Sequence, residues 1–306
     1  MLLGSAVLFP GALSGQEFLE HALSLFPIQT LRVEYYCLAK LRTTPGYAHN
    51  RSLFTGPRLK LLEDSFMQLG VKEADVEEMA IGWLNSPKGY QLMGGLARGQ
   101  FDAGRIAASA EEAKILPVEV GEWMAYCVGE ENSCLAVLDE THAAFGPADF
   151  LEAMQGARAG QTANLVSNPQ FVNLLGEIRT EPAIWGIALR EAVPDWFGTW
   201  LAGPQGASVD WSPLLGPAEA LSFYAEFNDN IEFHLNLDFL TAEAATRLLR
   251  TLETLRQLQQ AAWQSQSPGR PNPLDTVKLS GSDRRISITA VTEYANLEAG
   301  NPLGGR

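Results

Sequence analysis

Two carboxylates, Glu226 and Glu232, have types and spacing suited to chemistry, because a β-hairpin is predicted to place them directly opposite each other. Apolar and polar residues alternate on both sides of Asn228–Asn230, a segment whose residues tolerate turn conformations. A three-residue loop there pairs Phe227 with Ile231 and keeps one face of the hairpin apolar, which a two-residue loop would not do. The same register sets Glu226 against Glu232 on the polar face.

Directly opposed carboxylates repel each other, and either a bound cation or a raised pKa relieves the repulsion. A carboxyl group with a raised pKa can act as a general acid or base. His234, which is predicted to lie opposite Tyr224, and Asp238 share this face. The candidate catalytic residues of a carboxylate-dependent hydrolase are therefore Glu226, Glu232 and His234. The competing interpretation is a solvated outer face, which antiparallel sheets commonly have.

A long helix is predicted directly after the hairpin. Thr241 is a suitable N-cap, and Glu243 lies in the first turn, where the helix dipole favours a negative charge. Prolines from Pro268 onward end the helix. We expect its apolar residues, named here the helix stripe, to lie across the apolar face of the hairpin. The helix stripe consists of Ala245, Leu248, Leu249, Leu252, Leu255, Leu258 and Ala262.

Two cysteines, Cys127 and Cys134, are predicted to face each other across a second hairpin. Directly opposed cysteines can form a disulfide, although cross-strand Cβ distances are usually slightly too long for relaxed geometry. Two small buried thiols are the alternative. The chain has three cysteines, so at least one thiol is unpaired within the chain, and Cys37 is expected in the core.

An irregular segment at 194–217 is rich in proline, glycine and tryptophan. Loops this long are often functional, and aromatic side chains exposed on one would form a binding surface for a protein partner. The alternative is that the same side chains cap the core beneath the loop. The residues concerned are Trp196, Phe197, Trp200 and Trp211.

A further polar group, Arg98, Asp102 and Arg105, lies near the start of a helix predicted at 101–112. These residues could bind an anion together with the helix N-terminus, and a surface ion pair is the alternative. The sequence lacks the common nucleotide-binding, serine-hydrolase and zinc-protease motifs. Its four histidines are scattered, so no cofactor and no metal are expected.

The predicted fold class is α+β, with two similar repeat units that are each an antiparallel sheet of about four strands packed against helices. Both halves share an order of elements. Each ends in a hairpin to which register matching assigns a four-residue loop, Gly129–Asn132 in one and Gly281–Arg284 in the other. The expected organisation is an N-terminal segment at 1–50, a first repeat at 51–160, a second repeat at 161–295 that includes 194–217, and a flexible tail at 296–306.

Composition restricts the partners and the compartment. The net charge of −14 argues against a nucleic-acid binder, which needs a basic surface. No apolar run reaches the ~18 residues of a membrane-spanning helix. Residues 1–15 are apolar and rich in small residues, as in a signal peptide, but lack a basic start, so they are either a truncated signal or part of the fold. A periplasmic or extracellular location is favoured over the cytoplasm.

Three functions are consistent with these features. The first is a non-catalytic scaffold or binding subunit that acts through protein–protein contacts in a larger bacterial assembly or the cell envelope. The second is the carboxylate-dependent hydrolase. The third is a carrier that binds an apolar small molecule or lipid between sheet and helix. The lack of catalytic motifs, the acidic charge and the aromatic segment favour the first.

Overall fold

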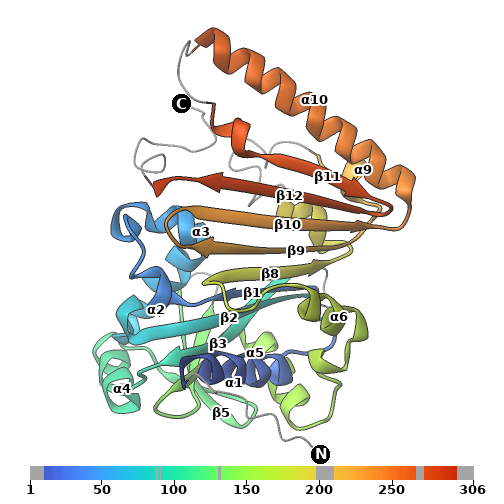
Figure 1. The fold of residues 1–306 in the computed structure, drawn as a ribbon. Helices are drawn as coiled ribbons and strands as arrows, with labels where there is room; N and C mark the ends of the chain where they lie inside the picture. The colour runs from blue at the N-terminus through green and yellow to red at the C-terminus, as the bar shows by residue number, and fades with distance from the viewer. Residues whose placement is uncertain are drawn as a thin grey trace, which may run out of the picture. The chain divides into compact units, whose positions relative to one another are not determined.

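The structure, a computed structural model, is a mixed fold of helices and a large antiparallel sheet (Figure 1). It describes residues 10–86, 89, 91–129, 132–197, 210–266 and 272–294. Three parts of the chain for which the sequence led to a prediction lie outside the described residues: 1–9, 198–209 with Trp200, and the predicted tail at 296–306. The chain divides into two compact units: unit 1 contains Met1–Thr30 and Leu61–Val172, and unit 2 contains Leu31–Lys60 and Asn173–Arg306.

The strands of unit 1 are antiparallel and follow the order β2-β3-β7-β6-β5-β4. Their bounds are Val76–Asn85 (β2), Gln91–Gly99 (β3), Pro117–Val120 (β4), Trp123–Val128 (β5), Ser133–Val137 (β6) and His142–Gly146 (β7). The helices are α1 (Pro10–Leu25), α4 (Ala103–Glu112) and α5 (Ala148–Arg158), with short 3-10 turns at Met67–Leu69, Glu73–Asp75 and Leu165–Ser167. Helix α1 packs against α5, β2 and β3.

Two glycines of β3 allow close packing inside unit 1. A Cβ on Gly94 would lie 2.4 Å from Cδ1 of Phe150, which α5 places against the sheet. A Cβ on Gly95 would lie 2.1 Å from the carbonyl oxygen of Ala80 on β2. Gly94 and Gly95 thus lie on β3 at points where other groups approach too closely for a side chain.

The strands of unit 2 are also antiparallel and follow the order β1-β8-β9-β10-β12-β11. Their bounds are Arg32–Tyr36 (β1), Ile184–Leu189 (β8), Ala218–Phe227 (β9), Ile231–Phe239 (β10), Lys278–Ser282 (β11) and Arg285–Thr292 (β12). The helices are α2 (Leu38–Leu41), α7 (Ala192–Trp196), α9 (Ser212–Leu215) and α10 (Ala242–Gln266), with a 3-10 turn at Pro273–Thr276. Helices α3 (Tyr47–Phe66) and α6 (Pro169–Glu177) each cross a boundary between the units along the chain.

The predicted hairpin is confirmed as β9 and β10, with the predicted register. Phe227 pairs with Ile231, and Glu226 pairs with Glu232. The side chain of Thr241 accepts a hydrogen bond from the backbone N–H of Ala244 at 3.2 Å, so the predicted N-cap of the following helix is confirmed. Alternation within each strand and the requirement for one apolar face were sufficient to determine this register.

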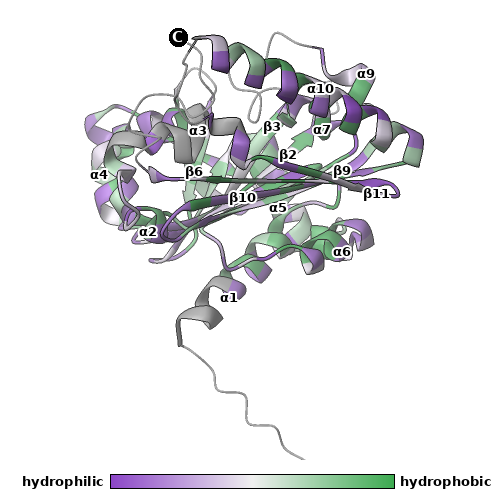
Figure 2. Cartoon of the chain, turned by 45° about the horizontal axis from the view of Figure 1, so that its top comes forward, coloured by the Kyte–Doolittle hydropathy of each residue, from purple (hydrophilic) through white to green (hydrophobic). Residues whose placement is uncertain are grey.

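The long helix covers less of the hairpin than predicted. Helix α10 packs against β10, β11 and β12, while α7 contacts β8 and β9. Leu248, near the start of α10, is buried, and the later members of the helix stripe are not. Figure 2 shows hydrophobic and hydrophilic residues alternating around α10. The amphipathic helix was therefore predicted correctly, and the extent of its burial was not.

The predicted sheets were too small. Each unit has six strands within the part of the chain that the structure describes, in place of about four. Strand β7 was missed because His142–Gly146 has two alanines and a glycine at its centre and end, residues with low β-propensity. The prediction of two similar repeats stays a prediction.

The last hairpin has a shorter loop than predicted. Ser282 pairs with Arg285, which leaves a two-residue loop, and the predicted four-residue loop Gly281–Arg284 is wrong. The observed register places Ser280 opposite Ser287, two positions from the predicted pairing. A shift of two residues keeps every side chain on its face, so the alternation pattern could not detect the error. The other predicted loop, Gly129–Asn132, is confirmed by the pairing of Val128 with Ser133.

The N-terminal segment expected at 1–50 is divided between the two units. Helix α1 packs within unit 1, whereas β1 pairs with β8 in unit 2. Both units are therefore discontinuous in sequence. The second stretch of unit 1 ends at Val172, whereas the boundary between the two repeats was predicted after residue 160. The division arises because β1 pairs with β8, a strand about 150 residues later in the chain, and a local sequence pattern cannot predict such a pairing.

Candidate functional site

The polar face of the β9–β10 hairpin brings the predicted catalytic residues together and adds a basic side chain to them. Arg179, just after α6, forms an ion pair with Glu226. Glu232 Oε2 lies 3.8 Å from Nε2 of His234, and the His234 ring stacks on Tyr224 with the ring centroids 4.5 Å apart. The guanidinium group thus offsets the repulsion that a bound cation or a raised pKa was expected to relieve.

One of the predicted catalytic residues lines a cavity. Glu226 lines a cavity of about 580 Å³ together with Lys40, Thr43 and Arg179, but Glu232 and His234 are not among its lining residues. Within the described ranges, no group of three histidine, cysteine or acidic residues is arranged to hold a metal ion. The hydrolase hypothesis required a pocket lined by all three candidates, and of these only Glu226 lines this cavity.

Two of the described aromatic residues of the segment at 194–217 belong to the core. Trp196 and Phe197 are buried, and Trp196 packs edge-on against Phe223 of β9 with centroids 4.9 Å apart. Trp211 is half-buried and contacts Phe197 at 5.0 Å. Trp200 lies outside the described residues. The prediction of a partner surface is therefore wrong for Trp196 and Phe197, because a docking residue has to be exposed and these two fill space between α7 and the sheet.

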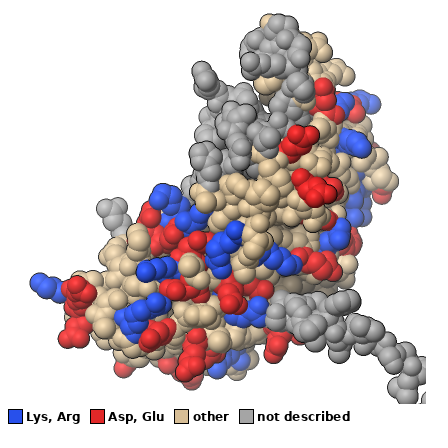
Figure 3. Space-filling model, turned by 60° about the vertical axis from the view of Figure 1, so that its left-hand side comes forward, with Lys and Arg blue, Asp and Glu red and all other residues tan. Residues whose placement is uncertain are grey.

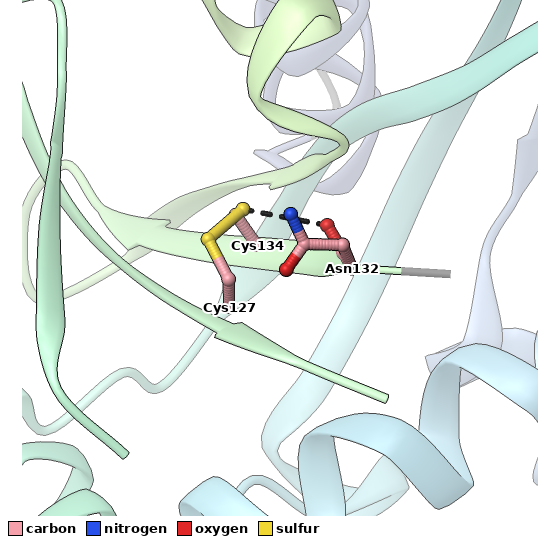
Figure 4. The surroundings of a disulfide bond; sticks show 3 residues. All are labelled: Cys127, Asn132 and Cys134. Carbon is pink, nitrogen blue, oxygen red and sulfur yellow. Dashed lines mark hydrogen bonds between the residues drawn. A yellow bond between two sulfur atoms is a disulfide. The ribbon is translucent and has the colours of Figure 1, made fainter. Parts of the chain in front are cut away.

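Cys127 of β5 and Cys134 of β6 form a disulfide (Figure 4). The two residues are directly paired across the strands, and Sγ of Cys134 lies 3.5 Å from the carbonyl oxygen of Asn132 in the connecting loop. Cys37 is buried, as expected, and is not part of a disulfide. The disulfide therefore closes a short loop within one hairpin of unit 1.

Reducing this disulfide is expected to lower the free energy of unfolding by about 2 kcal/mol, because the closed loop is short. Thermal unfolding with and without dithiothreitol measures the difference. The double variant Cys127→Ser, Cys134→Ser should melt at the lower temperature and should not respond to dithiothreitol. If dithiothreitol lowered the melting temperature of that variant as much as that of the wild type, the effect would come from Cys37 or from the reagent and not from the disulfide.

Arg98, Asp102 and Arg105 are engaged in intramolecular contacts, so the ion-pair interpretation holds for both arginines. Arg98 pairs with Glu78 at 3.0 Å, and Arg105 pairs with Asp75 at 2.8 Å. Asp102 caps α4 by accepting a hydrogen bond from the backbone N–H of Arg105. A cavity of about 950 Å³ adjoins this helix start, and its charged lining is mainly acidic. Its charged residues are Asp75, Asp102, Arg105, Asp139 and Glu140. This composition does not favour an anion.

A histidine pair in unit 1 was not found from the sequence. His21 of α1 and His142 of β7 have ring centroids 5.1 Å apart, and Nδ1 of His142 lies 3.1 Å from both carboxylate oxygens of Asp139. The spacing Asp139-x-x-His142 was the only local signal. The partner, His21, lies more than a hundred residues earlier, so the sequence could not show the contact.

The surface charge agrees with the composition. Figure 3 shows acidic and basic side chains interspersed over the described residues of one face. On this face the described residues show no concentration of positive charge of the kind that nucleic acid requires. Among the described residues, no helix combines the length and apolar character needed to cross a membrane.

Comparison with known proteins gives a likeness of fold. Crystal form I of TP0453 aligns over 91% of this chain and 95% of that chain, with 10% identity and a TM-score of 0.54. Crystal form III of the same protein aligns over 91% and 96%, with 9% identity and a TM-score of 0.50. No family model and no curated protein matches the sequence. At these identities the likeness shows a common fold and nothing about activity.

Proposed function

We propose that this chain is a non-catalytic binding protein that acts through protein–protein contacts made by unit 2. The observation that carries the proposal is the uncovered half of the helix stripe. Leu248 is buried, whereas Leu255 is 42% exposed and Leu258 is 63% exposed. An amphipathic helix normally buries its apolar face, so the second half of α10 has a surface suited to a partner.

The sheet beside α10 has the same feature. On the apolar face of β10, Leu235 is buried and Phe233 is half-buried; on β12, Ile286 is buried and Ile288 is half-buried. The less buried residue of each pair lies toward the paired ends Ile231 and Thr292. Burial thus decreases along both strands in the same direction, away from the end at which α10 begins.

The partner's chemistry follows from the composition of this surface. Leucines form its centre, and the positions at its edges on α10 carry Thr254 and Gln260. An apolar centre with a polar rim is typical of a protein–protein interface. We propose a partner segment that presents apolar side chains, such as an amphipathic helix. An apolar small molecule remains the alternative occupant, and the experiment below separates the two.

The compartment proposed is the periplasm or the cell exterior, as part of an envelope assembly. The Cys127–Cys134 disulfide supports this placement, because such bonds persist in oxidising compartments and are rare in the cytoplasm. The two units are further proposed to be repeats of one architecture. Their equal number of described strands and their uniformly antiparallel pairing support that idea.

The test compares two double variants of the full chain. Leu255→Gln with Leu258→Gln removes the apolar surface, and Gln257→Ala with Gln264→Ala, on the opposite face of the same helix, is the matched control. All four positions are exposed, so stability should change by no more than about 0.5 kcal/mol at each.

Each protein is purified from the native organism, and what accompanies it is identified by mass spectrometry. We expect a protein partner with the wild type and the control but not with the leucine variant. Retention of the partner by the leucine variant would contradict the proposal. Loss of a bound small molecule alone would favour the carrier.

A further inference from the structure

Helix α1 is attached to unit 1 through a histidine of another element. His21 of α1 meets His142 of β7 edge to face, with ring centroids 5.1 Å apart and an interplanar angle of 73°. Phe18, one turn earlier on α1, stacks on the same His142 ring at 6.4 Å. His142 therefore contacts two side chains of α1.

Asp139 fixes the orientation and tautomer of His142. An ionised carboxylate can only accept a hydrogen bond, so Nδ1 of His142 carries the proton that it shares with Asp139. Partial burial raises the pKa of Asp139, but hydrogen bonds from Thr141 and His142 outweigh it and lower that pKa to about 2. Asp139 is therefore ionised throughout the range in which histidines titrate.

The Asp139–His142 pair is not directed into the neighbouring cavity. Asp139 and Thr141 line the cavity of about 950 Å³, but His142 is not among its lining residues. The His142 ring contacts Phe18 and His21 of α1. This arrangement connects the pair to the docking of α1 and not to a substrate in the cavity.

The charges around His21 oppose its protonation. Burial is the main cause that lowers the pKa of His21, followed by the charges of His142 and Arg158, while Asp139 acts in the opposite sense. Arg158 lies on α5, which packs against α1. On β3, Arg98 lies 5.7 Å over the Phe18 ring and is paired with Glu78 of β2. The 3-10 turn Leu165–Ser167, which also contacts α1, carries no titratable side chain.

We propose that the His21–His142 contact is a proton-operated latch that holds α1 on unit 1 at neutral pH and releases it in mild acid. At neutral pH the His21 ring is uncharged and packs against His142. In acid His21 gains a positive charge while its ring is partly buried against His142, and the neighbouring Arg158 opposes that charge.

The direction of the pH dependence follows from linkage. Undocked His21 titrates near its ordinary pKa of 6.5, and docked His21 binds a proton less readily. The undocked state therefore takes up more protons, so docking is strongest above pH 6.5 and weakens as the pH falls below that value. Asp139 keeps its charge over this range and does not reverse the effect.

The test is hydrogen exchange of the full chain, followed by mass spectrometry at pH 7.5 and pH 5.0, with rates corrected for the intrinsic pH dependence of exchange. Protection of amides in 18–25 should fall by about tenfold in acid, as expected when His21 has to take up a charge that burial and its neighbours oppose. His21→Gln should abolish this fall. His234→Gln, which alters a stacked histidine in unit 2, is the matched control and should retain it.

Two results would overturn the latch: protection of α1 that does not change with pH in the wild type, or an unchanged fall in His21→Gln. If that variant does not fold, histidine proton resonances of the wild type decide the question. Titration of His21 below pH 6.5 that coincides with loss of α1 amide protection supports the latch. Titration at pH 6.5 without any change in α1 contradicts it.

Discussion

Glu34→Ala is expected to lower the free energy of unfolding by about 3–5 kcal/mol, although Glu34 contacts no cavity described above. Glu34 is 3% exposed and Arg32 is 4% exposed, both on β1. The Glu34 carboxylate accepts hydrogen bonds from Nε of Arg32 at 2.8 Å and from the hydroxyl of Tyr36 at 2.7 Å. Removing it leaves the guanidinium charge buried without its carboxylate partner.

Urea unfolding of two further variants tests the explanation. Glu226→Ala breaks the Arg179–Glu226 pair, in which the arginine is exposed, and should cost no more than about 1 kcal/mol. Replacing both members of the buried pair, Arg32→Met with Glu34→Leu, should cost less than Glu34→Ala alone, because no unpaired charge is then buried. A loss for Glu34→Ala no larger than that for Glu226→Ala would show that burial of the charge is not the cause.

Trp196→Ala is expected to have an effect of similar size, about 3–5 kcal/mol. Trp196 packs against Phe223, and the guanidinium of Arg32 lies 4.6 Å from the centroid of its ring. A Cβ on Gly186 would come within 2.6 Å of Cη2 of Trp196, so this ring occupies the space above the glycine. Its removal leaves a cavity and withdraws a cation–π contact from a buried arginine.

Trp211→Ala is the matched control for Trp196→Ala, since Trp211 is half-buried in the same aromatic segment. Its loss of stability should be clearly smaller, and thermal unfolding compares the two variants. Equal losses would mean that Trp196 packs no better than Trp211. A partner lost only with Trp211→Ala, at unchanged stability, would restore a binding role to the exposed part of the segment.

The sequence alone was sufficient for the β9–β10 hairpin of unit 2 and for the start of α10. Alternation along 221–239 and the need for one apolar face set the pairing of Phe227 with Ile231, and Thr241 marked the start of α10. The opposition of Glu226 and Glu232 followed from the same register. These features depend on residues that are neighbours along the chain or across one short loop, so a periodic pattern contains the information.

The alternation pattern did not predict the register of the last hairpin, in which Ser282 pairs with Arg285. Shifting the strand pairing by two residues leaves every side chain on the same face, so the pattern fits both registers equally well. Local patterns also failed for β7, whose alanines carry no strand signal, and for Trp196, whose loop composition resembled an exposed surface. In each case the outcome depends on which segments pack together, and burial is a property of the packed chain.

The sequence by itself determined the α+β class, the β9–β10 register, the N-cap of α10 and the opposition of Cys127 to Cys134. Only the tertiary structure decided that Arg179 neutralises Glu226 and that α10 leaves half of its stripe uncovered. It alone brought His21 to His142. The physical reason is distance along the chain: these contacts join segments tens to more than a hundred residues apart, and their energies are realised only when the sheet and helices have assembled.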